Sequence, residues 1–569
     1  MEKQHADTHR EAWTAPEEVG FEVTESDEAV ASGTSRHPDA VGYTMFDTPS
    51  SEDGTVTVIL PREHIDRVPR QSLVRILSRD GRQYLGVVVR GPFAEPDGLR
   101  ADAPVLTTAT ARGGLFLPKY HGRVQVELMG EELPDGGITP PRRRPLPNSA
   151  VLVLDVKEAG AILRSAGEIR LGLVDMHEDL EARIPMRKSV LPRHLGIMGT
   201  TGGGKSTTVS GLVTQLQRLG AAVVLLDTEG EYTAIHEPTI DPAMQQALAR
   251  RGMQPQGIQG THLYHLVGRE TTNPGHPNRT QFRLRFAELS PYAVKEILDL
   301  SDAQETRFFC VYEACKALLR DLKVYPKTPE QEREALDLDE FSTGYPHMTL
   351  SHLIDLAGAC LHLVGKSPGD PDFYNPIFQN NSQRVMERLR TYKLDHEVSW
   401  RALLAKLWRL HRLGVFDTQH GRDLDYEQMV RPGVVSIVDL SDTESSEIRN
   451  LAIAQLLRGI WQAQERSYEA AVAAGRYPTP VVIVIEEAHE FLSADRIARM
   501  PILFQQVARV ARRGRKRWLC LVFSTQLPQH LPDEVLGLIN NWILHKITDA
   551  GVVSRLRRSI TGIDDALWS

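Results

Sequence analysis

Two stretches of this sequence combine residues that are able to act on a phosphate. The first runs from Gly199 to Ser206 and matches the phosphate-binding loop pattern G-x-x-x-x-G-K-[ST]. Glycines permit a tight turn whose backbone N–H groups face phosphate oxygens, and the following helix presents its positive end to the same anion. We expect Lys205 to contact the β- and γ-phosphates of a nucleoside triphosphate and the Ser206 hydroxyl to bind Mg²⁺. The residues predicted to hold the triphosphate are Gly199, Thr200, Thr201, Gly202, Gly203, Gly204, Lys205, Ser206 and Thr207.

The second stretch is the acidic pair Glu486-Glu487, which directly follows the apolar run from Val481 to Ile485. A hydrophobic strand that ends in paired acids is the pattern of a Walker B element, the second half of an ATP site. We expect Glu486 to hold Mg²⁺ through its waters and Glu487 to polarise the attacking water. Adjacent carboxylates beside a core strand repel each other and are costly to desolvate, so a purely structural role without a metal is disfavoured.

A polar group ends the next apolar run, at Phe523-Ser524-Thr525-Gln526. Gln526 is placed to hydrogen-bond either the γ-phosphate or the attacking water, because the same sheet edge is expected to hold the phosphate. The alternative is an ordinary Ser/Thr strand end without a chemical role.

A basic run, Arg512-Arg513-Gly514-Arg515-Lys516-Arg517, lies between the acidic pair and that polar group. One interpretation is a solvated helix end, where cations also suit the helix dipole. The other is an arginine that reaches the γ-phosphate of a neighbouring subunit and stabilises transition-state charge. Arg512 and Arg515 are the candidates, and the sequence does not choose between them.

The elements that must position these residues alternate between apolar strands and helical patterns. The apolar runs are found at residues 195–198, 221–226, 434–438, 481–485, 519–523 and 542–545. Strands that alternate with helices predict an α/β fold with a largely parallel sheet, and ligands of such sheets bind at the carboxyl ends of the strands. We therefore expect all the candidate residues to lie at that edge.

Changes in composition and in hydrophobic periodicity divide the chain into five segments. An acidic, aperiodic tail at 1–38 is followed by short β-type runs that predict a small β-barrel with a Pro-rich linker at 39–148. The nucleotide-binding core is expected at 149–240 and 431–569, with an α-helical insertion at 241–430. Within the insertion, Arg279–Arg285 and Arg384–Lys393 could track nucleic-acid phosphates, although the first also fits a half-buried strand and the second an amphipathic helix.

The amino-acid composition excludes several classes of protein. Among 569 residues, 41% are hydrophobic, 25% are charged and the formal net charge is −8, which argues against a protein whose whole surface binds nucleic acid. A local basic surface, such as the lining of a ring, remains compatible with this charge. Four scattered cysteines, the lack of an eighteen-residue apolar run and the lack of a secretory h-region predict a cytoplasmic protein with free thiols and no membrane contact.

Taken together, these residues resemble the HerA branch of the FtsK–HerA family of hexameric DNA-translocating ATPases. The resemblance is carried by Arg193-His194, the loop Gly199–Ser206, Asp227-Thr228-Glu229-Gly230-Glu231-Tyr232, Glu486-Glu487-Ala488-His489-Glu490-Phe491, Gly514-Arg515-Lys516 and Ser524-Thr525-Gln526. One departure is Glu486, which stands where many P-loop ATPases have Asp and would reach the metal through a longer side chain.

The resemblance implies a RecA-like core, a ring of six copies with double-stranded DNA in its pore, and an arginine finger supplied in trans. It also implies a partner on the barrel side, either a nuclease or an NADase-type (sirtuin-like) effector, in DNA end processing or anti-phage defence. Two hypotheses follow: a helicase-like ATPase that translocates along duplex DNA, or an ATP-dependent scaffold that organises and activates the effector with little translocation.

Overall fold

The computed structural model describes residues 37–47, 54–98, 118–134, 138–162, 167–174, 177–184, 193–366, 368–443 and 445–560. All but the last two residues of the predicted acidic tail therefore lie outside the described residues. The chain forms two compact units, one of Met1–Arg164 with Leu173–Leu180 and one of Ser165–Gly172 with Glu181–Ser569. Among the helices of the described chain, none is long and apolar enough to cross a membrane.

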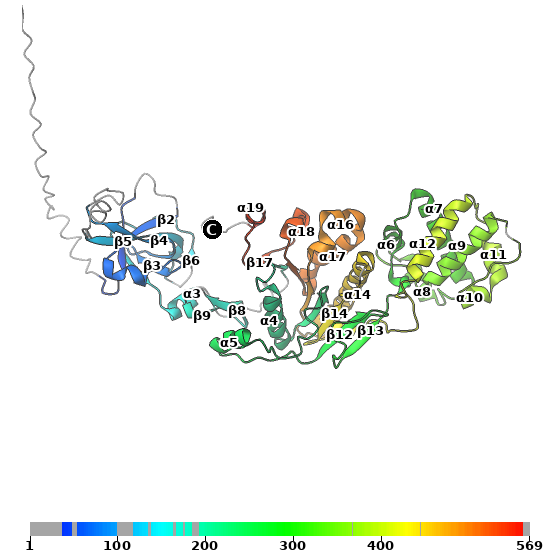
Figure 1. The fold of residues 1–569 in the computed structure, drawn as a ribbon, viewed down its shortest axis with the longest axis horizontal. Coiled ribbons are helices and arrows are strands. Elements are labelled where there is room, and N and C mark those ends of the chain that lie inside the picture. Colours follow the sequence, from blue (N-terminus) through cyan, green and yellow to red (C-terminus); the bar gives the residue numbers. More distant parts are fainter. Residues whose placement is uncertain are drawn as a thin grey trace, which may run out of the picture. The chain divides into compact units, whose positions relative to one another are not determined.

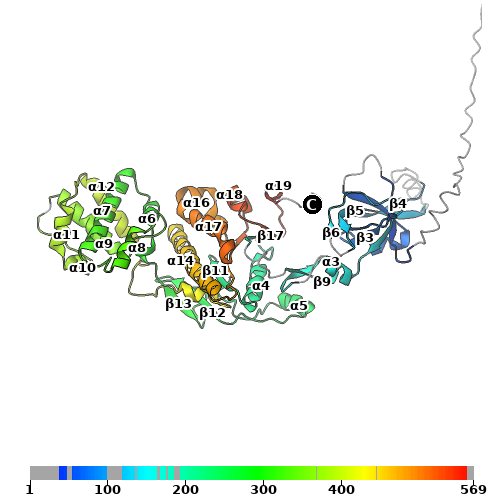
Figure 2. The ribbon, with the colours of Figure 1, turned by 180° about the vertical axis from the view of Figure 1, so that it is seen from behind.

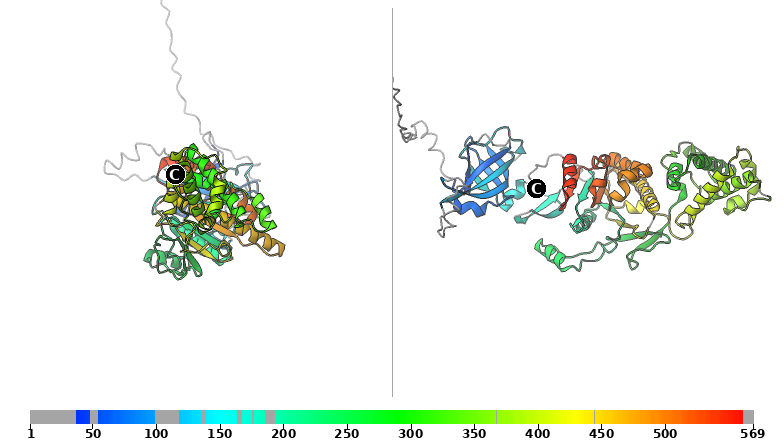
Figure 3. Two further views of the ribbon diagram at one scale, coloured as in Figure 1. Left: turned by 90° about the vertical axis from the view of Figure 1, so that its right-hand side faces the viewer. Right: turned by 45° about the horizontal axis from the view of Figure 1, so that its top comes forward.

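The N-terminal unit is built around a closed antiparallel barrel of six strands, drawn in blue and cyan in Figure 1 and Figure 3. The strand order is β2-β1-β7-β3-β4-β5, and pairing between β2 and β5 closes the barrel. Residues of β2 alternate between half-exposed and buried, and Val56, Val58 and Leu60 point into the core, as a period of two requires. The predicted small barrel is confirmed. Its strands are β1 (Gly42–Thr44), β2 (Thr55–Leu60), β3 (Leu73–Leu77), β4 (Gln83–Pro96), β5 (Tyr120–Glu132) and β7 (Ala150–Val153), with β6 (Ile138–Thr139) paired to β5, and η1 (Arg62–Arg67) and α3 (Val156–Ile162) beside them.

The second unit contains an eight-stranded parallel sheet in the order β13-β12-β14-β11-β15-β16-β10-β17. Its strands are β10 (Leu195–Met198), β11 (Ala222–Asp227), β12 (Thr261–Leu266), β13 (Arg279–Phe282), β14 (Val435–Asp439), β15 (Val481–Ile485), β16 (Leu519–Thr525) and β17 (Asn541–Leu544). The central strands β11, β14, β15 and β16 are buried at every position, which is why their sequences are mostly apolar. The predicted α/β fold with a largely parallel sheet is therefore confirmed.

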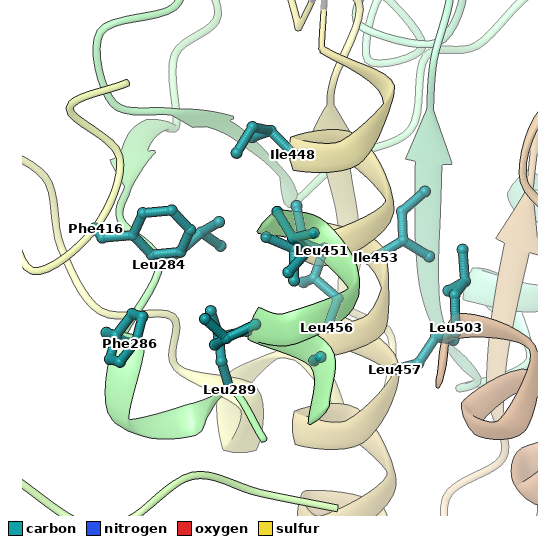
Figure 4. Close-up of a cluster of buried hydrophobic side chains, with 14 of the residues drawn as sticks. Leu284, Phe286, Leu289, Phe416, Ile448, Leu451, Ile453, Leu456, Leu457 and Leu503 are labelled. Atoms are coloured by element: carbon teal, nitrogen blue, oxygen red, sulfur yellow. The ribbon is translucent and has the colours of Figure 1, made fainter. Parts of the chain in front are cut away.

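Helices cover both faces of this sheet. On one face α4 (Lys205–Arg218) packs Val209, Val213 and Leu216 against alternate residues of the central strands. On the other face lie α14 (Ser446–Ala473) and α17 (Pro501–Arg513). Figure 4 shows Leu451 of α14 in this second core, and Leu457 of the same helix beside Leu503 of α17. α4 and α17 thus bury one face each, whereas the first half of α14 is buried on nearly all sides, including Asn450, Gln455 and Arg458.

The insertion predicted at 241–430 is not helical throughout, because β12 and β13 belong to the parallel sheet. Both strands carry polar residues that are satisfied by their neighbours: Thr261 bonds His276, and His262 bonds Thr280. These polar residues hid the strand pattern of β12. For residues 279–282 the strand alternative is correct, and Arg384 lies on helix α11 (Ser382–Leu389).

Apart from α5 (Pro242–Arg250), the helices of the insertion follow β13. The central helices α7, α9 and α12 pack together, as both Figure 1 and Figure 2 show. The helices are α6 (Pro291–Leu298), α7 (Asp302–Asp321), α8 (Pro329–Leu336), α9 (Leu350–Val364), α10 (Pro376–Gln379), α11, α12 (Glu397–His411) and α13 (Tyr426–Met429). The remaining elements are β8 (Ile169–Val174), β9 (His177–Ile184), α5 (Pro242–Arg250), η2 (Phe286–Glu288), α15 (His489–Leu492), α16 (Ala494–Arg499), η3 (Gly514–Arg517), η4 (Pro528–His530), α18 (Asp533–Leu536) and α19 (Ala550–Ser559).

Candidate functional site

The glycine-rich loop joins the carboxyl end of β10 to the first turn of α4. Gly202 and Gly204 have φ values of +73° and +93°, in the left-handed region that favours glycine. Gly204 is also the N-cap of α4 and carries no side chain to bond the first N–H groups, so these donors remain available to an anion. The Lys205 side chain is 7% exposed, and its Nζ lies 3.4 Å from the Thr200 carbonyl oxygen. The loop therefore has the local geometry of a phosphate cradle.

Two residues that follow β17, His545 and Lys546, hold this loop through hydrogen bonds. The Thr200 N–H and hydroxyl donate to the carbonyl oxygen of Lys546 at 3.2 and 3.1 Å, and His545 Nε2 lies 3.1 Å from the Thr208 hydroxyl. A Cβ atom at Gly199 would come within 2.5 Å of the His545 Cβ, which explains the glycine there. Sequence reasoning missed His545 and Lys546, since contacts that depend mainly on backbone proximity leave no motif.

Two buried carboxyl groups face each other where β11 and β15 end. Glu486 accepts a hydrogen bond from the Thr228 N–H at 3.2 Å and shares a hydrogen bond with Asp227. Asp227 also accepts from the N–H groups of Gly230 and Tyr232, at 2.7 and 2.8 Å. Burial, reinforced by the charge of Asp227, raises the pKa of Glu486, and burial likewise raises the pKa of Asp227. Sequence reasoning included Asp227 in the resemblance without giving it a role.

These oxygen atoms fit a Mg²⁺ ion. Carboxylates and hydroxyls are the donors that Mg²⁺ prefers, and it usually takes one or two carboxylates while phosphates and water complete its shell. Within the described ranges no group of three or more His, Cys, Asp or Glu side chains is arranged to hold a metal without such help. Ser206 lies in the first turn of α4, and Glu486 ends a strand of the same sheet edge.

Glu487 lies beside the loop in an unusual backbone conformation. Its φ is +41°, and its side chain is buried. It accepts hydrogen bonds from the Gln526 N–H at 3.3 Å and from His489, whose Nδ1 lies 3.1 Å from Glu487 Oε2. Burial would raise the pKa of Glu487, but the hydrogen bonds from His489 and Gln526 outweigh it and hold the pKa below its usual value. The Gln526 side chain in turn bonds the Thr201 hydroxyl of the loop.

The structure thus brings the predicted loop residues, Glu486, Glu487 and Gln526 to one sheet edge, but it places Arg512 and Arg515 at the opposite edge. These arginines precede β16, whereas Gln526 follows it. The expectation that every candidate lies at the carboxyl edge is therefore wrong for both arginines. Each is exposed, and no ion pair or hydrogen bond holds either side chain among the described residues. Nearby Arg517 differs, because it pairs with Glu465 and Glu469.

Comparison with known proteins identifies similar chains. The family model described as the central domain of the helicase HerA matches residues 169–460. A DNA double-strand break repair helicase HerA from Sulfurisphaera tokodaii is 21% identical over 415 residues, which cover 73% of this chain and 66% of that relative. The protein of the same name from Sulfolobus acidocaldarius is 22% identical over 503 residues, covering 87% and 82%. The chain thus spans just under two thirds of the first of these relatives.

Solved structures also show likeness. VirB4 of Thermoanaerobacter pseudethanolicus aligns with a TM-score of 0.39 and 14% identity, over 71% of this chain and 90% of that one. The bacterial conjugative coupling protein TrwB aligns with a TM-score of 0.34 and 12% identity, over 68% and 76%.

Proposed function

This chain belongs to the family defined by the central domain of the helicase HerA, and we propose that it is an ATPase that moves along double-stranded DNA. The observation that carries the proposal is the convergence of the Gly199–Ser206 loop, Glu486 and Glu487 at one edge of the sheet. That edge holds phosphate donors, metal-binding oxygens and a carboxylate for water activation, which are the parts that phosphoryl transfer needs.

ATP hydrolysis is assigned to these residues as follows. The N–H groups of the loop and Lys205 hold the β- and γ-phosphates in place, so that positioning replaces a bimolecular encounter. Mg²⁺, held by Ser206 and by Glu486 through water, supplies charge neutralisation at the phosphates when it is bound. Glu487 orients and polarises the attacking water, while Gln526 bonds the γ-phosphate or that water.

The shared site explains why the arginines lie at the far edge. Since Arg512 and Arg515 precede β16, neither can reach the loop of its own chain, and a neighbouring copy must supply them. A contact between opposite edges of two copies is heterologous, and such contacts form a ring where the rotation between copies closes. In the proposed assembly the ring is a homo-hexamer with duplex DNA in its pore, as the resemblance to hexameric DNA-translocating ATPases implies.

A partner completes the assignment. The HerA relatives are named as DNA double-strand break repair helicases, which supports a role in DNA end processing. The separate N-terminal barrel offers a docking domain for a nuclease or NADase-type effector, in end processing or in anti-phage defence.

A second candidate function is favoured by one observation, the formal charge of −8. A protein that tracks DNA phosphates normally shows a basic surface, so the acidic balance fits an ATP-dependent scaffold that activates the effector with little translocation.

One assay separates the two functions. The ATPase rate of the full chain is measured with and without linear duplex DNA over a series of salt concentrations, with Glu487→Gln as the inactive control. A motor gives a DNA-stimulated rate that weakens as salt rises, because phosphate contacts release counterions. A rate that ignores DNA but responds to a co-purified partner favours the scaffold, and a Glu487→Gln chain that hydrolyses ATP at the wild-type rate refutes the site.

A further inference from the structure

His489 lies against the residue assigned to activate water, although no role has been given to it. It begins the short helix α15, two residues after Glu487. Its Nδ1 lies 3.1 Å from Glu487 Oε2 and 3.0 Å from the Thr525 hydroxyl oxygen, and its side chain is 17% exposed. The histidine is therefore placed between the carboxylate and the end of β16.

The chemistry of the neighbours fixes which nitrogen carries the proton. An ionised carboxylate only accepts hydrogen bonds, so Nδ1 must be the donor to Glu487. Thr525 is anchored in its turn, because its hydroxyl oxygen accepts the Leu527 N–H at 3.1 Å. The single Nδ1 proton is thus shared between Glu487 Oε2 and the Thr525 hydroxyl oxygen, and it links the Glu487 side chain to the end of β16.

The other donors to Glu487 come from Gln526. Its N–H lies 3.3 Å from Glu487 Oε2, and its side chain bonds both Glu487 and the Thr201 hydroxyl of the phosphate-binding loop. In the proposed reaction the Gln526 side chain turns to the γ-phosphate or to the attacking water. Glu487 then loses that donor, and His489 is the side chain that remains bonded to it.

We infer that His489 is a positioning residue that keeps the Glu487 carboxylate aimed at the attacking water when Gln526 engages the nucleotide. The inference rests on the proposed ATPase function and adds a residue to it. The left-handed backbone of Glu487 makes such a support necessary, because a strained backbone persists only where its surroundings hold it. His489 acts through Glu487 and does not touch the phosphate.

Three substitutions test this role in the full-length chain. His489→Asn keeps an amide nitrogen at the position of Nδ1, His489→Gln moves the amide nitrogen outward to the region of Nε2, and His489→Leu removes the donor. For the Leu and Gln variants we expect kcat to fall about 100-fold, the loss that accompanies a shift of a reacting group by about 1 Å. The KM for ATP should change by less than about twofold, because the phosphate-binding loop is intact.

The Asn variant is the decisive control. It should recover kcat to within about threefold of the wild-type value, because the donor to Glu487 is restored at hydrogen-bond distance. In a Glu487→Gln background, His489→Leu should cause no further loss, since residues that act as a unit are not additive. Thermal melting of each variant checks that it is folded.

Several results would overturn the inference. These are a His489→Leu chain with the wild-type kcat, an Asn variant as slow as the Gln variant, or equal losses in kcat and in ATP affinity for all three variants. If His489→Leu does not fold, the Asn and Gln pair still decides, because both side chains are polar. An inactive wild-type chain, or full activity in Glu487→Gln, would instead contradict the proposed function on which the inference rests.

Discussion

At the carboxyl edge of the parallel sheet the charged side chains are buried and hydrogen-bonded, whereas at the amino edge Arg512 and Arg515 are exposed and have no partner in the described chain. Asp227, Glu486 and Glu487 each accept hydrogen bonds from backbone N–H groups. Buried carboxyl groups are costly unless they are paired or used, so clusters of this kind mark functional sites. In the proposed ATPase the carboxyl edge supplies one half of the phosphate site and the amino edge of a neighbouring copy supplies the other.

This contrast between the two edges indicates in which copy Arg512 and Arg515 can act. A chain folded alone holds the acids and the phosphate-binding loop, but its arginines lie at the wrong end of the strands for its own site. If the arginines take part in the reaction, they do so in another copy.

The largest effect is expected from Lys205→Ala, which removes the cation at the carboxyl edge. Because the ammonium group is buried beside the loop, its loss should weaken ATP binding at least about 100-fold, as expected for a charge-assisted phosphate contact. The measurement is a titration with a fluorescent ATP analogue. Lys327→Ala removes an exposed lysine from the helical insertion and is the matched control. Unchanged ATP affinity in Lys205→Ala would remove the loop from the site.

The next effect concerns the amino edge. Arg512→Ala or Arg515→Ala should lower kcat by about 1,000-fold at whichever position acts in trans, the lower end of measured arginine-finger effects. Arg517→Ala is the matched control, because its side chain is already paired with Glu465. The measurement is steady-state ATPase activity of each pure variant.

Mixing variants makes the comparison of the two edges direct. A Lys205→Ala copy retains its arginines, and an arginine variant retains its loop, so a mixture contains complete sites that neither pure protein has. We expect the mixture to hydrolyse ATP faster than the sum of the two pure variants. If both pure arginine variants turn over ATP at the wild-type rate, the shared site is refuted.

The elements that the sequence predicted well are those with a strong local signal. The phosphate-binding loop follows from spacing, and β11 and β15 follow from continuous apolar runs that need burial on both faces. The strand β12 was missed because it carries polar residues, of which Thr261 and His262 bond the side chains of His276 and Thr280. The contact between Glu486 and Asp227 could not be predicted, because these residues follow neighbouring strands that are distant in sequence. The same holds for the contacts of His545 and Lys546 with the phosphate-binding loop.

The position of Arg512 and Arg515 was mispredicted for a different reason. Sequence order places Arg512 just before a strand and Gln526 just after it, so their separation across the sheet could have been deduced from strand direction. We instead expected every candidate residue to lie at the carboxyl ends of the strands, and this expectation left the direction of β16 out of account. Chain order within a parallel sheet decides which residues of one copy can share a site.

The smallest effect should come from Glu296, which holds the start of α17, the helix that ends in the arginine run. Its carboxylate accepts the Ile502 N–H at 3.4 Å, and burial raises its pKa to about 7. A raised pKa means that the folded chain binds the proton more tightly, so this group's contribution to stability is full below about pH 4.5 and is lost as the pH rises through about 7. Glu296→Gln keeps a neutral acceptor. Its melting temperature should therefore exceed the wild-type value at pH 8 by more than at pH 6, with the exposed Glu330→Gln as the control for the loss of one carboxylate. A variant that melts below the wild type at pH 8 would show that the charged carboxylate, rather than its neutral form, supports the start of this helix.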